Sequence, residues 1–216
     1  MSSCFRPCAG NIEENQPLAG VSIGPTAMNL IANKSFKYLQ GYSGDTLAQV
    51  EKIMDGQGLG AWLLKKYPSG HGLRTDKALY DYVQTIKQAH LRGTEPLNKV
   101  AFDSKLQVVA HALGTHTTIS RVQGNKLKSK REIRIASLFK DTPAEFLKMI
   151  TVHELAHIKE RAHDKAFYQL CTYMEPSYHQ LEFEVRVYLT HLETSGERLW
   201  ESTIPLPAHA RTPSPP

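Results

Sequence analysis

Hydrophobic positions recur at helical spacing in the first half of the chain, after residue 37. The segment SGDTLAQVEKIMDG spaces Leu47, Val50 and Met54 at helical intervals and stops at Gly56. A second segment, TDKALYDYVQTIKQAH, begins at Thr75, which is suited to an N-cap. These patterns predict two amphipathic helices.

The pattern then changes to one typical of strands. The segment NKVAFDSKLQVV predicts a short hairpin around Asp103–Ser104. The longer segment THTTISRVQGNKLKSKREIRIASLF has two β-rich runs around Gly124–Asn125, a pair suited to a two-residue type II′ turn. These runs predict an antiparallel sheet.

Helical spacing returns after residue 140. In DTPAEFLKMI, Thr142 is the expected N-cap, Pro143 the first helical residue and Glu145 the partner in a capping box. A further helix is expected from Asp164 to just before Pro176, and a last one over about 177–193. The predicted fold class is α+β, with helices enclosing a small antiparallel sheet.

The two ends of the chain lack this periodicity. Residues 1–37 mix Gly, Pro, Asn and Ser, and residues 194–216 are rich in proline, so both are expected to be disordered. One domain over 38–193 fits the length of 216 residues. Because no apolar run suggests a signal peptide or a membrane span, we expect a cytoplasmic protein without a membrane partner.

Composition adds little to this picture. The net charge of +5 suits anionic partners but does not require nucleic acid. Three cysteines, Cys4, Cys8 and Cys171, argue against a disulfide framework and for a reducing compartment. The Cys4/Cys8 pair is only a weak candidate for a metal site.

Residues 151–163, TVHELAHIKERAH, carry the strongest chemical signal. On a helix, His153 and His157 lie about 40° apart and one turn along, so both imidazoles can reach one ion. Glu154 lies beside that ion without ligating it, where a general base is needed. The alternative is a solvated, histidine-rich helix face.

Zinc in a catalytic site takes a third protein ligand and leaves the fourth position for water. His163 is the obvious candidate. On a continuous helix it would lie about 15 Å along the axis from His153, too far to share an ion. The zinc hypothesis therefore requires the helix to end soon after His157, although no glycine marks a turn there.

From this motif onward, the chain resembles the YgjP-like metallopeptidase family, whose members share HELAH, a histidine six residues later and a following F-Y/W. The resemblance extends to RTDKALYDYVQ, VAFDSKLQVVAHALGTHT and SRVQGNKLKSKREIRIASLF, and so covers about 38–193. It implies a small zincin-like domain with His153, His157 and His163 as zinc ligands and Glu154 as general base.

Two enzymatic functions and one binding function follow as hypotheses. The favoured one is a metallopeptidase that lays an extended substrate along the edge strand leading into the zinc helix. Some family members carry the name UTP pyrophosphatase, for cleavage of UTP to UMP and diphosphate, which is the alternative. A non-catalytic adaptor that binds nucleic acid is hard to reconcile with an intact Glu154.

The nucleotide hypothesis needs an anion-binding group. Arg121, Lys126, Lys128 and Lys130 share one side of the predicted hairpin, as does Arg134. They are candidates to clamp phosphates, although a solvated cationic strand that protects a sheet edge is the simpler interpretation. The sequence shows no obvious residue to stabilise an oxyanion.

Overall fold

A computed structural model of the protein describes residues 36–106, 114–123 and 126–200, with the backbone alone for 114–130. The described residues do not include Cys4, Cys8, the Gly124–Asn125 loop or most of the second arm of the hairpin expected around Asp103–Ser104. Most of the lead and tail expected to be disordered also lie outside them.

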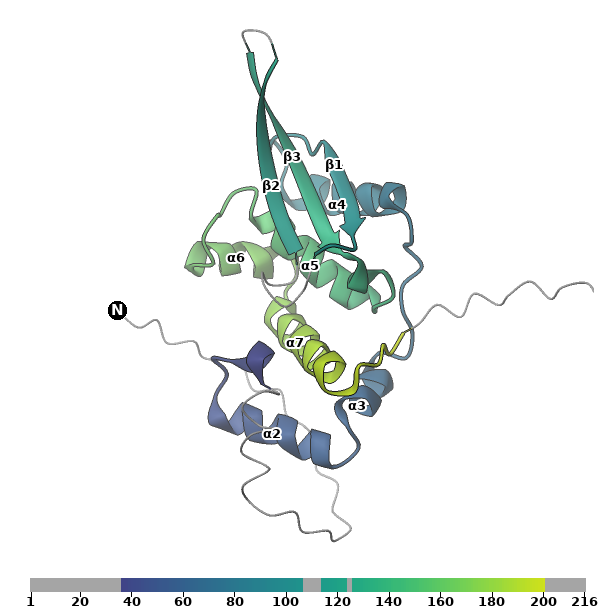
Figure 1. Ribbon diagram of the computed structural model, residues 1–216. Helices are drawn as coiled ribbons and strands as arrows, with labels where there is room; N and C mark the ends of the chain where they lie inside the picture. Colours follow the sequence, from purple (N-terminus) through teal and green to yellow (C-terminus); the bar gives the residue numbers. More distant parts are fainter. Residues whose placement is uncertain (1–35, 107–113, 124–125, 201–216) are drawn as a thin grey trace, which may run out of the picture.

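Helices precede and follow a run of three consecutive strands (Figure 1). Their bounds in chain order are η1 Lys37–Leu39, α2 Gly44–Asp55, α3 Leu59–Lys66, α4 Asp76–His90, β1 Lys99–Asp103, β2 Gly114–Gln123, β3 Lys126–Ala136, η2 Ser137–Lys140, α5 Ala144–Ala156, α6 Lys165–Met174 and α7 Tyr178–Ser195.

The three strands form a mixed sheet in the order β1-β3-β2. β2 and β3 pair antiparallel, whereas β1 pairs parallel with β3 over Glu132–Ala136. Beyond β1, therefore, β2 and β3 continue as a two-stranded ribbon that projects from the body (Figure 1). The α+β class is as predicted, but the expectation of an antiparallel sheet is wrong.

The parallel pairing of β1 has a physical reason. A local turn does follow β1, where Lys105 N donates to Asp103 Oδ1 at 2.8 Å. However, the partner of β1 is determined by long-range burial: Ile133 and Ile135 of β3 are fully buried, and Val100 of β1 is 3% exposed. Arg134 of β3 also bonds Asp103 at 3.0 Å.

α5 is the central helix, and the rest of the fold is built around it. From Phe146 to Ala156, every residue except Lys148 is buried. A helix that is apolar on all sides requires cover on all sides. α4, α6 and α7 and the strands β2 and β3 provide that cover.

The start of α5 is held differently from the prediction. Pro143 is the N-cap and has no capping side chain, so the predicted capping box with Glu145 does not form. Thr142 instead donates its hydroxyl to Phe139 O at 3.1 Å, because the 3-10 turn η2 immediately precedes the helix. The loop before α4 also contributes, since His71 N donates to Thr142 O at 2.9 Å.

The other helix predictions largely agree with the structure. α2 ends before Gly56, Thr75 Oγ1 caps α4 by accepting from Ala78 N, and Asp164 caps α6 by accepting from Phe167 N. α3 was not predicted. No helix in the described part of the chain is long and apolar enough to cross a membrane.

α7 runs two residues beyond its predicted end, and the chain after it returns to the core. Gly196 ends the helix in the left-handed conformation, with φ of 73°. Trp200 is then only 5% exposed, packs against Phe146 and Tyr188, and donates its indole N–H to Tyr67 O at 2.7 Å.

Candidate metal centre

The C-terminal end of α5 is where the chain reverses. The helix ends at Ala156 and His157 is its C-cap. A tight turn follows, in which Lys159 N and Glu160 N both donate to Ala156 O. The His157 ring closes this turn, since Nδ1 lies 2.9 Å from Glu160 O. The reversal that the zinc hypothesis requires thus forms without a glycine.

The reversal brings the three predicted histidines together. Each of His153, His157 and His163 offers one ring nitrogen as a ligand atom, and these three atoms lie within 4.8 Å of one another. The Nε2 atoms of His153 and His163 are 3.2 Å apart. His153 is 5% exposed, His157 half-buried and His163 exposed, so the cluster opens to solvent on one side.

Groups behind the imidazoles fix their orientation. His157 Nδ1–H donates to the Glu160 carbonyl, which leaves the Nε2 lone pair free. His153 Nδ1 lies 2.8 Å from the Tyr178 hydroxyl of α7. Such outer hydrogen bonds are typical of metal-ligating histidines.

Phe167 forms the floor of the cluster. Its ring centroid lies 5.0, 4.6 and 4.7 Å from those of His153, His157 and His163. Asp164, the residue after His163, is the N-cap of α6. It accepts from Phe167 N and so places Phe167 in the first turn of that helix, against the histidines. The apolar ring restricts the imidazoles and excludes water from their inner side.

The state of the imidazoles suits a metal. Burial, with smaller contributions from the charges of His157, His163 and Arg186, lowers the pKa of His153 to about 3. Burial also lowers the pKa of His163. Neutral imidazoles are the form that binds metals, and the three clustered imidazoles are suited to hold a metal ion.

Glu154 lies beside the cluster but does not belong to its set of ligands. It is 1% exposed, and its Oε2 atom has no hydrogen-bond partner among the described residues. Burial raises the pKa of Glu154 to about 8. An unpartnered buried carboxyl is costly, so it points to a functional role.

The basic residues of the hairpin are in the predicted register. Arg121 pairs with Lys128, Gln123 with Lys126 and Ile119 with Lys130 along the ribbon. The free end of this ribbon projects away from α5 (Figure 1). Arg134 is engaged in ion pairs with Asp103 and Glu132. The structure thus does not bring the ribbon's free end to the histidines.

Sequence reasoning missed the groups that α6 and α7 contribute. Phe167 enters the sequence analysis only as the F of the family's F-Y/W, and Tyr178 is not among its candidate site residues. Tyr178, Glu182 and Arg186 recur at intervals of four on α7 and so lie along one face. That spacing, with two charged residues on a helix that is otherwise largely buried, is the signal that could have found them.

Comparisons with known proteins agree with this geometry. A family model described as YgjP-like, metallopeptidase domain, matches residues 95–186. The chain is also 53% identical over 162 residues to a UTP pyrophosphatase of Escherichia coli (strain K12). That similarity covers 75% of this chain and 97% of the relative. No solved structure matches the chain.

Proposed function

Because this chain belongs to the YgjP-like metallopeptidase family, we propose that it is a zinc-dependent hydrolase and that its substrate is UTP, cleaved to UMP and diphosphate. The observation that supports hydrolysis is the convergence of three imidazoles beside the buried Glu154, whose Oε2 has no hydrogen-bond partner among the described residues. The 53% identity to a UTP pyrophosphatase over nearly all of that protein supports the substrate.

His153, His157 and His163 are the proposed zinc ligands. Zinc bound there supplies Lewis acidity and lowers the pKa of water towards ~7. Tyr178 and the Glu160 carbonyl hold two of the imidazoles in the ligating orientation. The proposed role of Glu154 is to take a proton from the attacking water and return it to the leaving group.

For UTP, the water oxygen bonds to the α-phosphorus while the bond from that phosphorus to the bridging oxygen breaks. The bridging oxygen leaves with diphosphate, and UMP retains the water oxygen. Burial raises the pKa of Glu154, so its carboxylate is a stronger base than that of a solvated glutamate and is suited to hold the proton in between.

Peptide hydrolysis is the second candidate, and the sheet edge favours it. The strand leading into α5 is β3, which is central, so the predicted substrate strand is wrong. β2 is an edge strand, and its outer side has no strand partner among the described residues. An extended peptide would therefore pair with β2. A non-catalytic adaptor would have no use for a buried Glu154.

A substrate panel on zinc-loaded protein tests the proposal. UTP, the other nucleoside triphosphates, an unfolded protein and a mixture of peptides are each incubated with wild type and with the His153→Ala/His157→Ala variant. We expect UMP and diphosphate from UTP with wild type only, lost on chelation and regained with zinc. Cleavage of peptides alone would identify a peptidase, and no cleavage of any substrate would refute hydrolysis.

A further inference from the structure

Arg186 places a positive charge on the face of α7 that approaches the histidines. Tyr178, at the start of α7, contacts His153, and Glu182 and Arg186 follow one and two turns later. Helical side chains lean towards the helix N-terminus, so the guanidinium lies back towards Glu182. Its Nη2 atom bonds Glu182 Oε1 at 2.8 Å.

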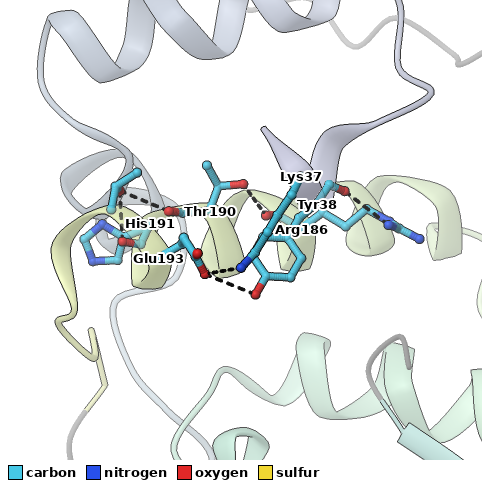
Figure 2. Close-up of polar contacts among 7 residues, drawn as sticks. Lys37, Tyr38, Arg186, Thr190, His191 and Glu193 are labelled. Atoms are coloured by element: carbon cyan, nitrogen blue, oxygen red, sulfur yellow. Dashed lines mark hydrogen bonds and ion pairs between the residues drawn. The ribbon is translucent and has the colours of Figure 1, made fainter. Parts of the chain in front are cut away.

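A second contact fixes the guanidinium from the other side. Nη1 of Arg186 donates to the Tyr38 carbonyl of η1 at 3.1 Å (Figure 2). η1 is itself bound to α7, because Lys37 pairs with Glu193 at 2.5 Å and the Tyr38 hydroxyl donates to the same carboxylate. The planar group is thus held in one orientation.

The guanidinium retains capacity to bind a ligand. An arginine has five N–H donors, and the two contacts leave several free. Its Nε atom is buried and has no hydrogen-bond partner among the described residues. The side chain as a whole is 30% exposed, so solvent and ligand can reach it.

Arg186 follows Tyr178, which contacts His153, by two helical turns, and its side chain leans back along α7 in that direction, where it carries a positive charge. Glu182 is 6% exposed and offsets part of that charge. An oriented guanidinium near a metal site is suited to phosphate oxygens, which it binds through two parallel hydrogen bonds.

We propose that Arg186 binds the phosphate oxygens of the substrate next to the histidine cluster, and that Glu182 is the positioning residue that orients it. This role rests on the proposed function, in which diphosphate is the leaving group. It assigns anion recognition to α7, whereas the sequence predicted phosphate-binding candidates on the basic hairpin.

Binding of inorganic diphosphate to the zinc-loaded full chain tests the role without turnover. Titration calorimetry compares wild type with Arg186→Lys, Arg186→Gln and Glu182→Gln, alongside zinc content and melting temperature. Losing a charge-assisted bond is expected to weaken binding about 10- to 100-fold. Arg186→Lys should also weaken it, since lysine lacks the planar fork. Zinc should stay at the wild-type level.

Lys66→Gln is the matched control, because it breaks an ion pair between α3 and α7 and leaves both contacts of Arg186 intact. It should lower the melting temperature while diphosphate binds as in wild type. If the Arg186 variants behave like this control, or if wild type does not bind diphosphate, the proposal is overturned.

Kinetics with UTP separate this role from the proposed function. Glu182→Gln should raise KM more than it lowers kcat, which a merely structural role would not do. If wild type binds diphosphate through Arg186 but does not cleave UTP, the anion site stands and UTP hydrolysis fails. Unchanged KM in Glu182→Gln would refute its positioning role.

Discussion

The carboxyl of Glu154 is an ionisable group that is buried with few hydrogen-bond partners. Leaving a buried polar atom without a partner costs about 1–3 kcal/mol, and in this chain the atom is Oε2 of Glu154. Apart from His153, the buried α5 residues on either side of Glu154 are apolar or, like Thr151, small. A group kept at such a cost, next to three potential ligands, is suited to accept a proton.

Glu154→Gln is expected to leave zinc bound and to abolish most turnover. The amide keeps the shape of the side chain but cannot accept the proton from water. Removing a positioned general base lowers the rate by about 10²–10⁴-fold. Zinc content by mass spectrometry and initial rates on the substrate found in the panel give the two readouts. Normal turnover would exclude Glu154 as the base, and loss of zinc would make it a ligand.

His163→Ala should weaken zinc binding and activity together, because it removes one of the three clustered imidazoles. His191→Ala is the matched control. His191 is also partly buried, but it lies on α7 next to Gly60 and outside the cluster. Competition with a chromophoric chelator measures both affinities. Full zinc affinity in His163→Ala would require another residue to complete the site.

At this scale the sequence predicted which histidines come together but not the residues that orient them. His153, Glu154 and His157 follow from helix geometry alone, since their spacing fixes their angles. Tyr178 and Arg186 are more than twenty residues further on. They reach the site only because α7 packs against α5, and a single sequence has no local signal for that contact.

At the scale of elements, α5 is held at its start by residues from distant loops. His71 is 9% exposed; its Nδ1 accepts from Leu73 N at 3.0 Å, and its Nε2–H therefore donates to Phe139 O at 2.7 Å. The bond from Leu73 N requires the neutral ring, because a protonated Nδ1 cannot accept. Propensity rules predicted a Thr142 cap, but this tertiary arrangement replaces it.

The unfolding free energy should depend on pH through His71. Burial is the main cause that lowers its pKa in the folded protein below 6.5. Its contribution is therefore present above pH 6.5 and is lost as pH falls through the folded pKa. His71→Gln should cost about 1–2 kcal/mol at pH 8, and its difference from wild type should shrink towards pH 5. Urea unfolding of the metal-free proteins measures this; a constant difference would contradict it.

At the scale of the whole molecule, a side chain beyond the expected domain, that of Trp200, is buried in the core. The prediction of a domain over 38–193 omits Trp200, which packs between Phe146 and Tyr188. We propose that the folded unit includes residues 36–200. The sequence did not predict the burial of Trp200, because a single aromatic residue in a proline-rich segment after Gly196 leaves no periodic pattern.

Trp200→Ala in the full chain should lower stability by about 3–5 kcal/mol, the usual cost of removing a buried tryptophan. A chain ending at residue 193 should melt well below one ending at residue 200, while both bind zinc. Calorimetric melting temperatures give the comparison. Equal melting temperatures for the two truncated chains would show that the edge lies at 193 after all.

All three candidate ligands lie within residues 153–163, and this has a consequence for folding. A segment so short brings its imidazoles within reach of one ion even when the rest of the chain is unfolded. The proposed zinc would therefore bind both states, and any affinity for the unfolded state reduces the stability that the ion adds to the folded one. During synthesis, the nascent chain could take up zinc through this segment before α7 has emerged, and Tyr178 would then dock onto an already chelated His153.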